Sequence, residues 1–134
     1  MSYQCDRVSL VPDMAKKNTP KVWARPRLRV QCGDNVALGP GKVELLALVA
    51  ETGSIREAGA QMDMSYMRAW TLIRTMNHCF ARPLVEAARG GRTGGGAQLT
   101  DTGKQVLALY QRMEQSCLSA IDEDWRAVKK LLRR

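Results

Sequence analysis

The sequence is poor in histidine and in long apolar runs, and each shortage excludes a class of protein. One histidine, His78, leaves little acid–base chemistry near neutral pH, and no Ser/His/Asp or Cys/His set follows from the spacing. No apolar run approaches the ~20 residues that cross a bilayer. Residues 1–30 carry charges and prolines in place of an apolar signal core. We therefore expect a cytoplasmic protein that has no membrane partner and is not an enzyme.

The cysteines are also too few and too scattered to form a metal-binding pattern. None of the four is paired as CxxC, and adjacent His78 and Cys79 would point about 100° apart on a helix. The glycine-rich run lacks the GxxxxGK[ST] and GxGxxG patterns that hold nucleotide phosphates. The interpretation we favour is reduced, unpaired thiols with no metal and no cofactor.

Positive charge, in contrast, is abundant. The 134 residues include 21 Lys and Arg against 13 Asp and Glu, for a net charge of +8. This balance favours a polyanionic partner, either nucleic acid or an acidic membrane surface. Residues 1–25 lack periodicity and are predicted to be a flexible basic arm. The arm has two open interpretations, a non-specific contact with the DNA backbone or a tail without a role.

Two short helices joined by a tight turn are predicted in the middle of the chain. The first runs from about Ser54 to Gln61, with Ser54 as N-cap and Glu57 completing a capping-box pattern. After a three-residue turn, Ser65 caps a second helix that ends near Phe80. The outer side of the second helix carries Met67, Arg68, Thr71, Arg74, Thr75 and His78.

This outer side has cations and hydroxyls but no carboxylate, which suits phosphates and base edges. The pair therefore predicts a helix-turn-helix motif whose second helix is the recognition helix. The alternative is an ordinary helical hairpin within a soluble core.

Two β-hairpins are predicted, one on each side of this motif. Residues 27–38 alternate between apolar and polar side chains and are expected to turn at Gly33–Asn35. An apolar core helix, Lys42–Glu51, follows and stops at Gly53. After the motif, a strand at Leu84–Ala87 leads into the glycine-rich run Arg89–Ala97.

The glycine-rich run has the position of a wing, directly after the recognition helix. It contains two arginines and no acidic residue, so Arg89 and Arg92 are expected on the DNA backbone or in a minor groove. Its glycines let the backbone approach closely and donate N–H groups to phosphates. The alternative is a plain flexible loop.

A long last helix is predicted from the Thr100 cap to about Leu132, or ~48 Å. A helix of this length cannot bury its whole apolar stripe on so small a domain, so the surplus is expected to pack on a second copy. The alternative is a stripe that packs on its own core, with a frayed end. The predicted dimerisation residues are Val106, Tyr110, Met113, Cys117, Ile121, Trp125 and Val128.

Several separate motifs also occur in an order that is typical of one family. They are Leu38-Gly39-Pro40, Thr52-Gly53-Ser54-Ile55, Ser65-Tyr66 with Ala69-Trp70, Pro83-Leu84-Val85, Gly90-Gly91 with Gly94-Gly95-Gly96, and Leu99-Thr100 with Gly103. Over about residues 27–118 the chain resembles the amino-terminal domain of the molybdate-responsive (ModE-type) transcription regulators. These are winged-helix proteins related to the DNA-binding domain of LysR-type regulators.

The resemblance implies a dimer that binds duplex DNA, with the second helix of the motif in a major groove. It implies that the first helix and the wing hold the backbone. Family members often have a lysine at the position of Met67, where this chain departs from the pattern. By position, the backbone helix starts at Ser54, Ile55 and Arg56, the groove is faced by Ser65, Tyr66, Met67, Arg68 and Thr71, and the wing is Arg89, Gly90, Gly91, Arg92 and Thr93.

Full-length members continue into small β-barrel domains that bind molybdate. This sequence has no strand-rich segment after its last helix, so molybdate binding by this chain is not implied and the effector stays open.

The predicted fold is therefore mainly α with small β-hairpins. It comprises a basic arm (1–25), a winged helix-turn-helix domain (26–100) and a dimerisation helix (101–134). The predicted function is a sequence-specific, homodimeric, double-stranded-DNA-binding transcription regulator, with molybdenum-related genes as a candidate target. The alternatives are a protein-interaction module on a winged-helix scaffold, and a small oxyanion or metal sensor.

Overall fold

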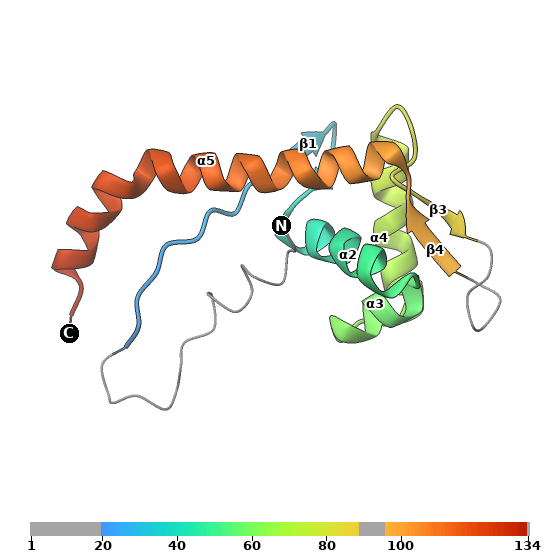
Figure 1. Cartoon of the computed structure of the whole chain (residues 1–134), viewed down its shortest axis with the longest axis horizontal. Helices are drawn as coiled ribbons and strands as arrows, with labels where there is room; N and C mark the ends of the chain where they lie inside the picture. Colours follow the sequence, from blue (N-terminus) through green and yellow to red (C-terminus); the bar gives the residue numbers. More distant parts are fainter. Residues whose placement is uncertain (1–19, 89–95, 134) are drawn as a thin grey trace. The chain divides into compact units, whose positions relative to one another are not determined.

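The structure is a computed structural model that describes residues 20–88 and 96–133 (Figure 1). Its helices and two antiparallel hairpins confirm the predicted class, a winged helix-turn-helix with a long C-terminal helix. Most of the predicted basic arm and the tip of the wing lie outside the described residues. The elements are β1 (Val30–Cys32), β2 (Asn35–Leu38), α2 (Pro40–Thr52), α3 (Ile55–Gln61), α4 (Tyr66–Cys79), β3 (Val85–Ala88), β4 (Gly96–Leu99) and α5 (Asp101–Leu131).

The chain divides into two compact units, of which residues 27–112 contain the hairpins, α2 to α4 and the start of α5. The core of this unit is mainly aliphatic, and α2 supplies more of it than any other element. Val43, Leu45, Leu46 and Val49 have no exposed surface. Helix α2 begins at Pro40, two residues before the apolar segment Lys42–Glu51, as expected for a proline whose missing N–H costs nothing in the first turn of a helix. Within the described residues, no helix combines the length and apolar character needed to span a membrane.

The β1–β2 hairpin is confirmed, but its turn is tighter than predicted. Asn35 pairs with Cys32 as the first residue of β2, so that the turn consists of Gly33 and Asp34 alone. Gly33 has φ 60°, a left-handed conformation that glycine adopts without steric cost.

The helix-turn-helix is confirmed together with both of its N-caps. The Ser54 and Ser65 hydroxyls accept the amides of Glu57 and Arg68, each at 3.1 Å. The capping box is half formed, because the Ser54 amide donates to Thr52 Oγ1 at 3.2 Å. The two helices cross closely at Gly59, where a Cβ would lie 2.9 Å from the Cβ of Ala69.

Helix α5 begins as predicted, under the Thr100 cap. Thr100 Oγ1 accepts the Gly103 amide at 3.0 Å and donates to the Pro83 carbonyl at 2.7 Å. At Gly103 the helix touches the backbone so closely that a Cβ would lie 2.1 Å from the Leu84 oxygen. These contacts fix the start of α5 against the first residues of the wing.

Tyr110, one of the predicted dimerisation residues, is buried in the core of the single chain. Its side chain is 1% exposed, and its hydroxyl donates to the Leu28 carbonyl at 2.7 Å. Tyr110 shares the spacing of the apolar stripe, yet it lies within the unit formed by residues 27–112 and belongs to that core.

Candidate nucleic-acid interface

The exposed face of α4 is the predicted one. Its buried side consists of Ala69, Ile73 and Met76. The outer residues Met67, Arg68, Thr71, Arg74 and His78 are exposed and Thr75 is half-buried. Met67 is 68% exposed, so most of this apolar residue is open to contact with a partner. The helix therefore presents two cations and two hydroxyls on one solvent-facing surface.

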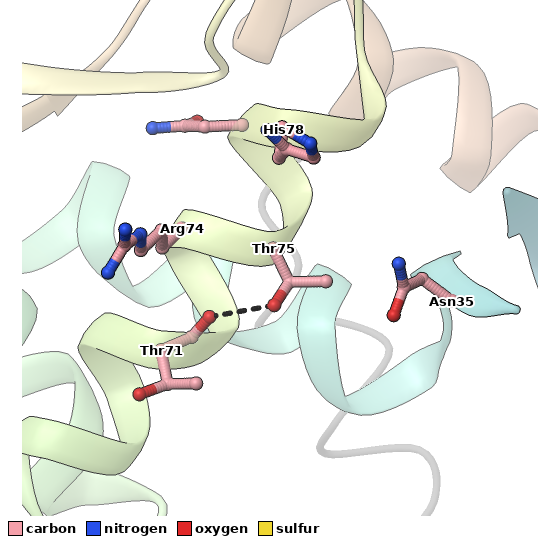
Figure 2. A pocket seen from close by; sticks show the side chains of 6 residues that line it. Asn35, Thr71, Arg74, Thr75 and His78 are labelled. Carbon is pink, nitrogen blue, oxygen red and sulfur yellow. Dashed lines mark hydrogen bonds between the residues drawn. The ribbon is translucent and has the colours of Figure 1, made fainter.

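Both hydroxyls on this surface donate hydrogen bonds to backbone carbonyls of the same helix. Thr71 Oγ1 donates to the Met67 carbonyl at 2.8 Å, and Thr75 Oγ1 donates to the Thr71 carbonyl at 3.0 Å (Figure 2). Each oxygen is left as an acceptor. While it donates to the helix, each hydroxyl can only accept a hydrogen bond from a ligand. The threonines can therefore accept from the amino groups of adenine and cytosine, but they cannot donate to phosphate oxygens.

Two arginines, one on α3 and one on α4, are held over aromatic rings. The Arg56 guanidinium lies 4.7 Å from the centroid of the Tyr66 ring, and that of Arg74 lies 5.6 Å from the Trp70 ring. Such contacts restrict the side chain before a ligand arrives and keep the charge at the surface. Trp70 was not among the predicted DNA contacts, although its spacing of four residues from Arg74 on one helix could have indicated the pair.

A groove of about 720 Å³ separates the helix-turn-helix from the wing strands. Arg56, Tyr66 and Trp70 line one wall, and residues of β3 and β4 line the other. Glu86 on the wing wall accepts a hydrogen bond from the Gln98 side chain at 3.0 Å, which occupies one of its carboxylate oxygens. The groove thus combines aromatic surface and cations with two carboxylates, Glu57 on the helix side and the partly engaged Glu86 on the wing side.

The base of the wing is tied to α4 by a single side chain, Asn77. Its Oδ1 accepts the amides of Leu84 at 2.8 Å and Val85 at 3.2 Å, and its Nδ2 donates to the Val85 carbonyl at 3.1 Å. The other strand is held at Gly53, whose carbonyl accepts the Ala97 amide at 2.9 Å. Helical spacing in the sequence did not point to Asn77, because its role depends on its hydrogen bonds to Leu84 and Val85 and not on a repeating pattern.

The predicted wing contacts themselves lie outside the described residues. They are Arg89, Gly90, Gly91, Arg92 and Thr93.

A second depression, of about 520 Å³, lies on the outer side of α4 towards the β1–β2 turn (Figure 2). Asn35 from the hairpin and Thr75 and His78 from α4 line it, together with Thr71, Arg74 and Asn77. None of these six residues is a carboxylate. Asn35 was expected only as part of the β1–β2 turn and was not among the predicted DNA contacts.

Lys42 and Cys79 lie at the base of the same hairpin. The Lys42 ammonium donates to the Val36 carbonyl, and partial burial lowers the pKa of Lys42. Burial raises the pKa of the Cys79 thiol, and the neighbouring Cys32 thiol raises it further. Cys32 in turn donates to the Cys79 carbonyl at 3.8 Å. In the part of the chain that the structure describes, no three His, Cys, Asp or Glu residues are grouped for a metal ion.

The remaining predicted dimerisation residues differ in exposure. Met113, Ile121 and Val128 are 45%, 39% and 49% exposed. Val106, Cys117 and Trp125 are half-buried. Large apolar side chains at this spacing leave an apolar strip on α5 in the single chain.

Comparison with known proteins finds sequence matches among bacterial regulators. Residues 41–104 match the model of the bacterial regulatory helix-turn-helix proteins of the lysR family. The molybdenum transport protein ModE of Azotobacter vinelandii is 38% identical over 96 residues, which is 72% of this chain and 36% of that protein. The DNA-binding transcriptional dual regulator ModE of Escherichia coli K12 is 39% identical over 83 residues, 62% of this chain and 32% of that protein.

A third relative carries a different name. The molybdenum-pterin-binding protein MopB of Rhodobacter capsulatus is 43% identical over 77 residues, 58% of this chain and 28% of that protein. The chain thus spans about a third of the length of the curated relatives it matches.

Proposed function

From the match of residues 41–104 to the lysR family of bacterial regulatory helix-turn-helix proteins, we propose that this chain is a member of that family and a transcription regulator that binds duplex DNA. The observation that carries the proposal is the exposed face of α4, with Arg68, Arg74 and two threonines and without a carboxylate. A helix with this face fits a major groove, where arginine reaches guanine and threonine oxygens accept from exposed amino groups.

The genes that it controls are proposed to be related to molybdenum. Relatives named for molybdenum transport and for DNA-binding regulation are 38% and 39% identical to this chain, over 96 and 83 residues. Molybdate is not proposed as a ligand of this chain, and the effector stays open. We place its action in the cytoplasm, where the chromosome is.

The protein is proposed to act as a homodimer. Exposed Met113, Ile121 and Val128 form an apolar strip on α5 whose burial between two copies would remove it from water. A two-fold dimer would also present two α4 helices to the two half-sites of a palindromic operator.

The proposal is tested by incubating the purified protein with genomic DNA fragments at a low and a high salt concentration and sequencing the retained fragments. We expect enrichment of a palindromic site that survives the higher salt. Phosphate contacts release counterions, so sequence-blind binding should weaken steeply with salt. Retention without a common sequence would contradict specific regulation. Absence of retention at both salts would contradict DNA binding and favour a protein-interaction module.

A further inference from the structure

We propose that the β1–β2 turn is a second DNA-contacting element, in which Asn35 together with His78 of α4 holds the sugar–phosphate backbone of one DNA strand. This inference rests on the proposed function, because it concerns how the same recognition helix is seated. It adds a contact on the side of α4 away from the wing, where the resemblance to known regulators implies none.

The first step of the argument is the position of α4 between two β-hairpins. Asn77 binds the start of β3, whereas the Cys79 carbonyl accepts from Cys32 on β1. At about 100° per residue, Asn77 and Cys79 lie on nearly opposite sides of the helix. The exposed face that carries Thr71, Arg74 and His78 lies between these two sides. The recognition helix therefore has one hairpin on each flank.

The second step is the shape of the DNA. A major groove is about 12 Å wide, and a helix with its side chains is about 10–12 Å across. A helix that enters the groove therefore has a phosphate backbone on each of its two flanks. In this arrangement the wing contacts the DNA backbone on the Asn77 side of the helix. The DNA backbone on the other side must pass the β1–β2 turn.

The third step is the chemistry of the depression beside that turn. Figure 2 shows Asn35 on the hairpin facing the side of α4 that carries Thr75 and His78, across the open space. Both Asn35 and His78 are exposed, and each has an N–H group that can donate to a phosphate oxygen. Because none of the six lining residues is a carboxylate, a phosphate meets no negative charge among them.

Asp34 supplies an internal test of the electrostatics. It is exposed in the same two-residue turn but does not line the depression. If a backbone phosphate passes Asn35, the Asp34 carboxylate lies near it and opposes binding. Neutralising this residue should therefore strengthen binding, whereas the loss of Asn35 should weaken it.

The experiment compares Asn35→Ala, His78→Ala and Asp34→Asn in the full chain, with Gln31→Ala as the matched control on the same hairpin. Gln31 is exposed on β1 and does not line the depression. The probes are a mixed-sequence duplex and the duplex recovered from the genomic selection. Phosphate ethylation interference on the recovered duplex then maps the backbone contacts. Circular dichroism of each variant verifies that these surface changes leave the fold intact.

We expect Asn35→Ala and His78→Ala each to lower the affinity for both duplexes about tenfold, as for the loss of one hydrogen bond to a charged group. Asp34→Asn should raise it, and Gln31→Ala should not change it. Since asparagine is uncharged, Asn35→Ala should leave the salt dependence unchanged. In both weakened variants, interference should disappear at phosphates on one flank of the groove and persist on the wing flank.

An affinity within twofold of the parent for both Asn35→Ala and His78→Ala, with unchanged interference, would overturn the inference. A loss confined to the recovered duplex, again with unchanged interference, would also overturn it, since that pattern indicates contact with a base. Failure of the proposed function would look different, because the parent protein itself would not bind either duplex.

Discussion

In the proposed DNA contact, single exposed residues of α4 are expected to determine the base preference, and we expect Arg68 to contact a base. It is exposed in the first turn of α4, beyond the Ser65 cap that accepts its amide. Arg68→Ala should weaken binding to the selected operator by about 1–3 kcal/mol and relax the base preference at one position. The measurement is competition between the operator and its single-base variants.

Arg126→Ala is the control for net charge in this experiment. Arg126 carries the same charge, but it lies on α5 in an ion pair of 3.0 Å with Asp122. A loss for Arg68→Ala that is equal across all sequences would assign Arg68 to the backbone instead.

At Gly103 the chain depends on the absence of a side chain. A Cβ there would approach the Leu84 carbonyl to 2.1 Å, and a backbone atom cannot rotate away as a side chain can. Gly103→Ala should lower the free energy of unfolding by about 3 kcal/mol, at the upper end for overpacking. Urea titration measures this change. Gly41→Ala is the control: a Cβ meets nothing within 4 Å, and it should raise stability by up to about 1 kcal/mol.

The Cys79 thiol makes the stability of the fold sensitive to alkaline pH. Burial raises its pKa above the ordinary value of 9.0, so the folded chain holds the proton more tightly than the unfolded chain. This contribution is complete below pH 9.0 and is lost as the pH rises through the raised pKa of the folded state. The lowered pKa of Lys42 acts in the opposite direction, since stability rises as that lysine deprotonates before its unfolded counterpart.

Cys79→Val should therefore show a smaller loss of stability above pH 9.0 than the parent. Thermal unfolding from neutral to alkaline pH measures the difference, and Cys117→Val on α5 is the control. An identical alkaline decline in the parent and in Cys79→Val would show that other groups cause it.

The sequence was informative about these residues where a repeating pattern determined the side of a helix. Arg68 and Arg74 follow from helical spacing alone, and the structure leaves both exposed on α4. Asn77 and Asn35 did not follow, because their roles depend on hydrogen bonds and surfaces formed with residues that are distant in the chain. Tyr110 was misjudged for the same reason, since its partner is the carbonyl of Leu28.

Among the elements, the position of the wing relative to α4 depends on Asn77. Asn77→Ala would leave the amides of Leu84 and Val85 without their side-chain acceptor, in a partly buried place. The expected cost is about 2 kcal/mol of unfolding free energy, the scale for unsatisfied backbone groups. DNA affinity should fall as well, because the wing loses its fixed position. Chemical denaturation and duplex binding measure the two effects.

Gln98→Ala is the control for this variant. Its amide binds Glu86 on the exposed side of the same hairpin, where water can replace the partner. If Gln98→Ala cost as much as Asn77→Ala, the special role of Asn77 would be refuted.

Element boundaries were predictable where a cap determines them. Ser54, Ser65 and Thr100 each accept an amide three residues on, and Gly53 ends α2 with φ 69°. The β1–β2 turn was predicted one residue too long. Asparagine is common in turns, but here Asn35 pairs with Cys32 as the first residue of β2. Caps act within one turn of helix, whereas strand pairing depends on the partner strand.

At the scale of the whole molecule, the proposed dimer requires the exposed strip on α5. Ile121→Glu would place a charge in the middle of this strip, and burying that charge against a second copy is costly. We expect the variant to sediment as a monomer where the parent sediments as a dimer. It should also bind a single half-site as weakly as one domain does.

Gln115→Glu adds the same charge on an exposed part of α5 that is off the apolar strip, and it should remain dimeric. A parent protein that sediments as a monomer, or an Ile121→Glu variant that remains a dimer, would remove this strip from the interface.

The attachment of the wing at both of its strands has a consequence for how new operators are acquired. β3 is fixed through Asn77 and β4 through the carbonyl of Gly53, so neither anchor depends on the residues between Ala88 and Gly96. We therefore expect mutations that lengthen, shorten or replace that segment to leave both anchors in place. Under the proposed function, evolution or a protein engineer could then change this segment without changing the base preference of α4.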